Sequence, residues 1–212
     1  KFDGTRLQVH FRHQKGKLKT WLFTRSLEDI AEMFPDISRG IEKEIEAKSV
    51  ILDGEVIGYN AKTGQLLPFQ KTIQRKRKHQ IKEAIAKTPL RYYCFDILYF
   101  NGQSLLDTPF YKRRKILKKL ITQKGKKKKI FLSPQILTDD PKELKTYHQK
   151  QINKGLEGVV VKKWRSSYDV GKRGFTWVKF KQEKGKAGGG LSDTIDGVVM
   201  GYYRGRGRRA ES

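Results

Sequence analysis

The sequence predicts an α+β fold in which two largely antiparallel β-sheets are flanked by helices. Three observations support this fold class. Segments with strand and helix character are mixed along the 212 residues without a regular strand–helix–strand alternation. Several apolar segments alternate with period two, which is typical of half-buried strands. Turn sequences such as Asn101-Gly102 directly follow predicted strands, which favours antiparallel hairpins.

The first half of the chain is expected to contain four strands and three helical segments. Residues 7–12 alternate between apolar and polar side chains, and the turn at 14–17 returns the chain into a second strand. Ser26 has the character of a helix cap, with Asp29 three residues later. The predicted strands are 7–12, 18–25, 50–59 and 90–100, and the predicted helical segments begin at Ser26 or cover 41–46 and 68–78.

The second half is expected to add two helices and four strands. A helix over 109–122 carries an apolar stripe, and basic residues are expected to cover its opposite face. Small residues at 185–190 indicate a flexible linker, which divides the chain into domains over 1–186 and 187–212. The other predicted elements are strands at 130–132, 158–162, 175–181 and 195–203 and a helix at 141–154.

The net charge of +25 indicates a polyanionic partner. Lys and Arg total 47, against 22 Asp and Glu. Such a positive field attracts nucleic acid above all, whereas any single basic cluster could equally be a solvated surface without a specific use. The basic residues concentrate at 74–78, 112–115, 126–129 and 204–209.

Neither a membrane span nor an internal disulfide is expected. No apolar run approaches the roughly 18–20 residues needed to cross a bilayer, and no targeting signal is visible. The single cysteine, Cys94, lies in an apolar run, so a buried core thiol is predicted. Because the chain opens directly on a motif and not on Met, we expect a fragment cut at its N-terminal side.

That opening motif is Lys1-Phe2-Asp3-Gly4-Thr5-Arg6, which places a lysine beside a tight turn with an arginine close by. Lysine ordinarily has a pKa of about 10.4, so a nucleophilic lysine needs a site that favours its neutral amine. A surface lysine before an Asp-Gly turn is the alternative interpretation.

Two acidic residues lie in or beside predicted strands. Glu55 has apolar neighbours on both sides, and a buried carboxylate there needs a partner such as Mg²⁺ or a ribose hydroxyl. Glu157 precedes a β-branched strand that ends at Lys162. Regular alternation points these two side chains to opposite faces, whereas a bulge near Gly158 would bring both toward one cleft. Solvent-exposed strand ends are the alternative for both acids.

An aromatic residue and a pair of lysines complete the candidate site. Phe95 either packs in the core or stacks on a base, and Asp96 either caps a local turn or pairs with a cation. Lys179 and Lys181 share one face of a predicted strand, where they repel each other unless an anion lies between them. A triphosphate or a nucleic-acid phosphate would supply that anion, and an ordinary half-buried strand is the alternative.

Taken in order, these patterns resemble the covalent nucleotidyltransferases, and most closely the ATP-dependent DNA ligases. The similarity covers essentially the whole chain. Longer stretches at 95–102 and 168–174 also resemble DNA ligase, and 192–207 resembles the opening strand of the family's oligonucleotide-binding (OB-fold) domain. The short motifs are Lys1-x-Asp3-Gly4-x-Arg6, Asp53-Gly54-Glu55, Phe95-Asp96, Glu157-Gly158-x-x-x-Lys162 and Lys179-x-Lys181.

The resemblance implies a role for each motif. Lys1 would attack the α-phosphate of ATP and carry AMP as a phosphoramidate, while Phe95 stacks on adenine. Glu55 and Glu157 would bind Mg²⁺, and the same acids would serve the ribose. AMP would then pass to the 5′-phosphate of a nick in duplex DNA, and the 3′-hydroxyl would displace it. The remaining sugar and phosphate contacts would come from Arg6, Lys162, Arg173, Lys179 and Lys181.

The same resemblance implies an adenylation domain over 1–186, without its N-terminal start, and the truncated beginning of an OB-fold domain over 187–212. A monomer is expected, located in the cytoplasm or nucleoid of a prokaryote and otherwise wherever DNA is. Because the OB-fold domain stops after about one strand, efficient self-adenylylation by these residues alone is not expected. An RNA ligase, an mRNA-capping guanylyltransferase and a non-catalytic basic nucleic-acid-binding module are the alternative functions.

Overall fold

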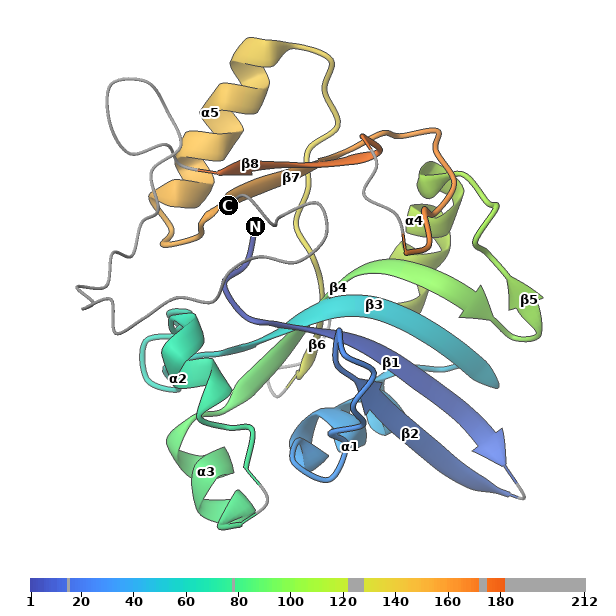
Figure 1. Ribbon diagram of the computed structural model, residues 1–212, viewed down its shortest axis with the longest axis vertical. Helices are drawn as coiled ribbons and strands as arrows, with labels where there is room; N and C mark the ends of the chain where they lie inside the picture. Colours follow the sequence, from blue (N-terminus) through green and yellow to red (C-terminus); the bar gives the residue numbers. More distant parts are fainter. Residues whose placement is uncertain (15, 78, 122–127, 172–174, 182–212) are drawn as a thin grey trace, which may run out of the picture. The chain divides into compact units, whose positions relative to one another are not determined.

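The computed structural model describes residues 1–181 except 15, 78, 122–127 and 172–174, and residues 1–181 form one compact unit (Figure 1). The α+β fold class is confirmed. The predicted linker at 185–190 and the predicted strand at 195–203 lie outside the described residues, so the domain division stays a prediction.

The larger sheet has six strands in the order β2-β1-β3-β4-β5, with β6 paired to β4. All neighbours are antiparallel except β4 and β6, which run parallel. The predicted strands at 90–100 and 130–132 are confirmed with the same bounds. The strands are β1 (Thr5–Gln14), β2 (Lys17–Phe23), β3 (Ser49–Gly58), β4 (Leu90–Phe100), β5 (Gln103–Ser104) and β6 (Ile130–Leu132).

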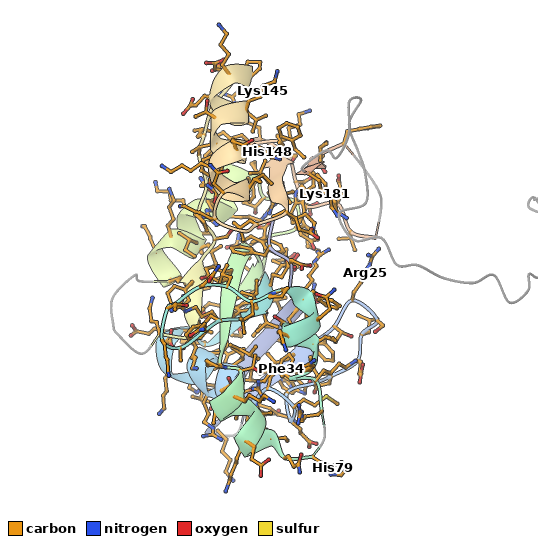
Figure 2. The ribbon with its side chains drawn as sticks, turned by 90° about the vertical axis from the view of Figure 1, so that its left-hand side faces the viewer. Arg25, Phe34, His79, Lys145, His148 and Lys181 are labelled. Carbon is orange, nitrogen blue, oxygen red and sulfur yellow. The ribbon has the colours of Figure 1, made fainter. Side chains whose placement is uncertain are left out.

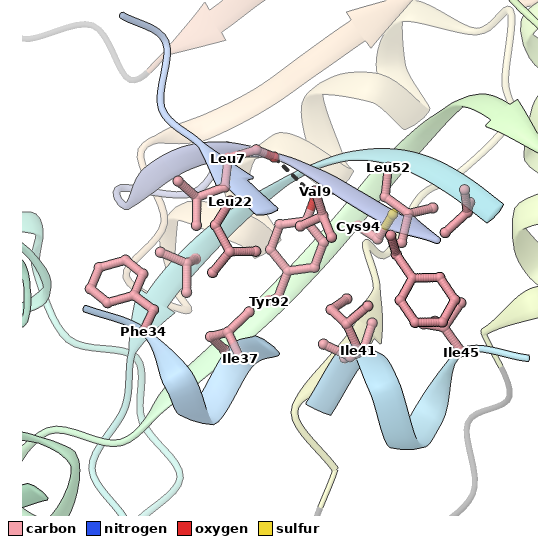
Figure 3. Packing of buried hydrophobic residues seen from close by; sticks show 14 of the residues in the cluster. Leu7, Val9, Leu22, Phe34, Ile37, Ile41, Ile45, Leu52, Tyr92 and Cys94 are labelled. Atoms are coloured by element: carbon pink, nitrogen blue, oxygen red, sulfur yellow. Dashed lines mark hydrogen bonds between the residues drawn. The ribbon is translucent and has the colours of Figure 1, made fainter. Parts of the chain in front are cut away.

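The hydrophobic core lies between this sheet and α1 (Pro35–Glu44). The helix points Ile37 and Ile41 toward the sheet, and both side chains are fully buried (Figure 3). Burying a side chain of this size contributes about 1.5–3 kcal/mol, so this layer fixes the sheet on which the site is built. Cys94 is part of the core, as predicted, and burial raises the pKa of its thiol.

A close contact between Gly54 and Tyr92 joins three strands. The buried Tyr92 hydroxyl donates a hydrogen bond to the Leu7 carbonyl at 3.0 Å (Figure 3). Its ring passes directly over Gly54, where an added Cβ would lie 2.4 Å from the ring. The glycine of the Asp53-Gly54-Glu55 motif is therefore required by packing.

The smaller sheet pairs β7 (Gly158–Lys162) with β8 (Trp177–Lys181) in antiparallel register. Helix α5 (Pro141–Ile152) is capped by Asp140, whose carboxylate accepts a hydrogen bond from the Lys142 amide at 2.8 Å. The helix covers the smaller sheet, and its His148 ring stacks on Phe180 with 4.2 Å between centroids (Figure 2).

Two predictions about helices are wrong. No helix begins at Ser26: Phe23 and Asp29 form an isolated bridge, and the Asp29 carboxylate accepts backbone hydrogen bonds that fix a turn. The basic helix predicted at 68–78 is reduced to α2 (Phe69–Ile73), because Arg75 turns inward to the Asp36 carboxylate at 2.7 Å. A short helix that was not predicted, α3 (Ile81–Lys87), follows.

The amphipathic helix predicted at 109–122 is present as α4 (Phe110–Leu120). The expectation that its basic residues cover the face opposite the apolar stripe is wrong for Arg113 and Arg114, which are 0% and 3% exposed. The Arg113 guanidinium binds the Asp96 carboxylate, which compensates for removing it from water, whereas Arg114 donates to the Ser133 carbonyl and its Nε has no partner among the described residues. In the described part of the chain, no helix is long and apolar enough to cross a membrane.

Candidate functional site

A cavity of about 570 Å³ lies where the larger sheet, the smaller sheet and α5 meet. The start of β1, one residue of β3 and one of β4 contribute to its lining, together with both strands of the smaller sheet and the segment that precedes α5. Six of the residues predicted from the sequence line this cavity: Lys1, Arg6, Glu55, Phe95, Lys162 and Lys179.

Lys1 is held between the two sheets. Its carbonyl oxygen accepts a hydrogen bond from the Glu157 amide at 3.1 Å, and its side-chain amine donates to the Glu157 carboxylate. The next residue, Phe2, is buried and stacks on Tyr93 with 4.4 Å between ring centroids. A Cβ at Gly4 would lie 2.3 Å from a β3 carbonyl oxygen, so only glycine allows this close approach. These contacts fix the lysine amine at the cavity.

Two carboxylates flank that amine. Glu55 accepts a hydrogen bond from the Gly4 amide at 3.0 Å, and burial raises its pKa while the Gly4 hydrogen bond and the charge of Lys1 oppose the rise. Glu157 lies immediately before Gly158, whose φ of +134° is open only to glycine. Burial acts to raise the pKa of Glu157, but its hydrogen bond to Lys1 and the nearby Lys181 charge lower it.

Arg6 belongs to a charged cluster on β1 and β3. Its guanidinium binds the Asp53 carboxylate through two hydrogen bonds of 3.0 and 2.6 Å. The Tyr168 hydroxyl lies 2.9 Å from both the Arg6 guanidinium and the Asp53 carboxylate. The hydrogen bond to Asp53 raises the pKa of Arg6 despite partial burial. Arg6 is thus a fixed cation, with 47% of its side chain still exposed.

Asp96 forms a second cluster, and of the two predicted alternatives, a turn cap or a cation pair, the structure shows the cation pair. It accepts hydrogen bonds from Arg113 at 2.8 and 3.1 Å, and both side chains are fully buried. The Lys162 amine lies 3.8 Å from the same carboxylate. Burial lowers the pKa of Lys162 to about 8, and the charge of Asp96 opposes this effect.

The aromatic part of the site combines Phe95 with Trp177. Their rings meet edge to face, with centroids 5.7 Å apart, and both line the cavity. The Arg6 guanidinium lies about 6 Å from each ring centroid. An aromatic ring at the cavity wall offers a flat surface for a base, which is the arrangement expected of Phe95.

The predicted phosphate ligands on β8 are on the surface. Lys179 is exposed and lines the cavity, and Lys181 is exposed and lies 3.5 Å from the Glu157 carboxylate. Glu157 therefore connects Lys1 with Lys181. Arg173 lies outside the described residues. Glu55 and Glu157 could together hold one divalent cation, although the described residues contain no group of three or more His, Cys, Asp or Glu side chains suited to a metal.

Residues 1–181 match the family model described as "ATP dependent DNA ligase domain". The chain belongs to this family. It is 42% identical over 211 residues to the probable DNA ligase of Dictyoglomus turgidum, covering all of this chain and 34% of that relative. It is 39% identical over 212 residues to the DNA ligase of Caldivirga maquilingensis, again covering 34% of the relative. The chain thus spans about a third of the length of the curated relatives it matches.

Solved ligase structures resemble the fold. The ligase domain of M. tuberculosis LigD aligns with a TM-score of 0.65 and 26% identity, covering 87% of this chain and 54% of that one. A mycobacterial DNA ligase D complexed with ATP and MES aligns with a TM-score of 0.64 and 27% identity, covering 87% and 53%. The predicted resemblance to the ATP-dependent DNA ligases is confirmed.

Four residues of this ligase-family site were given no role from the sequence alone: Asp53, Arg113, Tyr168 and Trp177. For Asp53 a signal was present, because it shares its strand face with Glu55 and its motif was recognised. Tyr168 begins the stretch at 168–174 that resembles DNA ligase, and Trp177 follows that stretch. For Arg113 the helical pattern was misleading, since it places a basic residue toward solvent.

Proposed function

We propose that this chain is the adenylation domain of an ATP-dependent DNA ligase that seals nicks in duplex DNA through an AMP adduct on Lys1. The observation that supports this most directly is the setting of the Lys1 amine. It lies in a cavity that also presents an aromatic wall at Phe95, a cation at Lys179 and the Glu55 carboxylate, and it donates a hydrogen bond to the Glu157 carboxylate. A nucleotide has a base, a sugar and phosphates that match these groups.

In the proposed reaction, the neutral Lys1 amine attacks the α-phosphorus of ATP. A P–N bond forms, the P–O bond to pyrophosphate breaks, and pyrophosphate leaves. The 5′-phosphate at the nick then attacks the adenylate, which releases Lys1 and gives a DNA adenylate. Finally the 3′-hydroxyl attacks this phosphate, forming the phosphodiester and releasing AMP. Each step transfers one phosphoryl centre, so positioning and charge neutralisation carry the catalysis.

The other residues serve the nucleotide in this proposal. Lys179 and Lys181 bind phosphate oxygens, and Arg6 contacts the sugar or the nick phosphate through the exposed part of its guanidinium. Glu55 and Glu157 would hold Mg²⁺, a cation that usually takes one or two protein carboxylates and completes its shell with water and phosphate. When bound, Mg²⁺ neutralises phosphate charge. Arg173 is a further proposed phosphate contact.

The DNA partner is proposed from family and charge together. A chain with 47 basic and 22 acidic residues can neutralise many backbone phosphates without reading base sequence. Action as a monomer in a DNA-containing compartment is part of the same proposal.

The decisive test combines nucleotide binding with detection of the adduct. Calorimetry should show binding of ATP in preference to GTP or NAD⁺. Intact-mass spectrometry after long incubation with ATP and Mg²⁺ should show one AMP on Lys1, at a slow rate, and none on Lys1→Arg. Binding or labelling by GTP in place of ATP would favour a capping guanylyltransferase. If the chain binds DNA but binds no nucleotide, a non-catalytic nucleic-acid-binding module would be favoured.

A further inference from the structure

The Lys162 amine is enclosed by aromatic rings. Only 12% of its side chain is exposed, and its nitrogen lies 3.5 Å from the Trp177 ring centroid. The Phe95 and Phe110 centroids are 4.5 and 4.7 Å away. A cation within about 6 Å of a ring centroid is attracted by the ring face, and more strongly when it is desolvated. Three rings therefore provide most of the surroundings of this charge.

Asp96 lies on the remaining side of the amine, at 3.8 Å. Its carboxylate is already occupied by two hydrogen bonds from Arg113. Among the described residues the Lys162 nitrogen has no hydrogen-bond partner. The amine is thus held by the rings and by the charge of Asp96, without a hydrogen bond to that carboxylate.

Lys162 is a third cation beside two acids that are already paired with arginines. Asp53 and Asp96 are direct cross-strand partners on β3 and β4, and like charges in such positions repel each other. Arg6 and Arg113 each bind one of the two carboxylates. Lys162 adds a further positive charge at the point where the two acids meet, and its excess charge faces aromatic rings.

We infer that Lys162 is a positioning residue for the base: it fixes the Phe95 and Trp177 rings on which adenine stacks, and it does not bind phosphate. The inference rests on the proposed nucleotide site. To reach the Lys162 nitrogen, a phosphate group would have to displace a ring and approach the Asp96 carboxylate. Lys179 lines the same cavity without such an enclosure, so it is open to an anion.

Comparison of adenosine with AMP separates the two roles. Adenosine lacks the phosphate, so loss of a phosphate ligand leaves its affinity unchanged, whereas loss of ring positioning weakens both compounds equally. In Lys162→Met, NMR titration should show adenosine and AMP weakened by the same factor, about tenfold. Lys179→Met should weaken AMP alone. Lys163→Met, the exposed neighbour, should change neither.

Stability measurements exclude a merely structural effect. Methionine fills a similar volume without a buried charge, so the thermal midpoint of Lys162→Met should be unchanged or raised while base affinity falls. If that variant does not fold, Phe110→Leu removes one ring of the enclosure, and it should weaken adenosine and AMP by equal factors.

A loss confined to AMP in Lys162→Met would overturn the inference, as would unchanged adenosine binding in either variant. If the unaltered chain binds neither compound, the nucleotide site itself is wrong and both proposals fall. If the unaltered chain binds both compounds but Lys162→Met does not weaken them by the same factor, the proposed function stands without the positioning role.

Discussion

Asp53 and Asp96 occupy paired positions on neighbouring strands, yet their arginines are placed very differently. Arg6 binds Asp53 from the cavity, and 47% of its side chain is exposed. Arg113 binds Asp96 from α4, and neither side chain is exposed at all. The chemistry of the two pairs is the same, so the difference lies in access. An arginine beside the cavity can also meet a ligand, whereas a fully enclosed one can only support the structure.

The strongest expected effect comes from Arg113→Met. Removing one partner of a buried ion pair leaves an uncompensated charge, which typically costs about 3–5 kcal/mol. Here Asp96 would keep the Lys162 amine at 3.8 Å and a backbone hydrogen bond from the Ile97 amide at 2.9 Å, but no cation that donates a hydrogen bond to it. Urea denaturation should show the loss, with Lys112→Met on the exposed side of the same helix as the control. A loss of stability as small as that of Lys112→Met would mean that burial does not make the Arg113–Asp96 pair more important than the Arg6–Asp53 pair.

The pH dependence of stability tests the same buried cluster. In the folded chain, burial lowers the pKa of Lys162 from 10.5 to about 8. Folding therefore disfavours the protonated form of this amine. Below pH 8 the charged amine must be buried, which destabilises the fold. As pH rises from 8 toward 10.5, the unfolded chain binds the extra proton and stability rises, by up to about 3 kcal/mol.

The comparison with Lys162→Met isolates this effect from other titrating groups. The unaltered chain should gain free energy of unfolding relative to the variant between pH 8 and 10.5, as measured by denaturant titrations at each pH. A difference between the two proteins that is constant with pH would contradict the expected direction.

Arg6→Met should destabilise the chain less than Arg113→Met. Asp53 would lose two hydrogen bonds but keep the Tyr168 hydroxyl, and water can enter from the cavity, so about 2 kcal/mol is expected. Nucleotide affinity should fall as well, which is not expected of a purely structural pair. Equal losses of stability in the two arginine variants would remove the distinction between them.

Tyr168→Phe gives the smallest change. It removes the hydroxyl that donates to Asp53 and accepts from the partly exposed Arg6, and it leaves the bidentate contact between Arg6 and Asp53, so the free energy of unfolding should fall by about 1 kcal/mol. Tyr111→Phe is the matched control, because that ring is partly exposed. A loss well above that of Arg6→Met would show that Tyr168, and not Arg6, holds the cluster.

The sequence predicted strands best where apolar residues and turn signals agreed. The long apolar run at 90–100, closed by Asn101-Gly102, and the short β-branched run at 158–162 have the predicted bounds. Predictions failed where a distant side chain decides the local structure. Asp29 fixes a turn near Ser26, and Arg75 turns inward to Asp36; neither effect is visible in local propensity.

The candidate site was likewise predicted well on strands and poorly where a distant side chain decides the contact. Its motifs lie on strands, where alternation and order along the chain indicate which residues share a face. Asp96 interrupts an apolar run, and it was expected either to cap a local turn or to pair with a cation. The cation itself, Arg113, could not be found, because a helical pattern describes the helix surface and not the carboxylate that another strand presents to it.

The contact between Gly54 and Tyr92 also has a consequence for sequence change in this family. A side chain at position 54 would occupy space that the Tyr92 ring already fills, and a smaller residue at position 92 alone would leave a cavity and an unpaired Leu7 carbonyl. We expect each substitution alone to destabilise the fold more than the two together. Within the family, a change at one of these positions should therefore be accompanied by a change at the other.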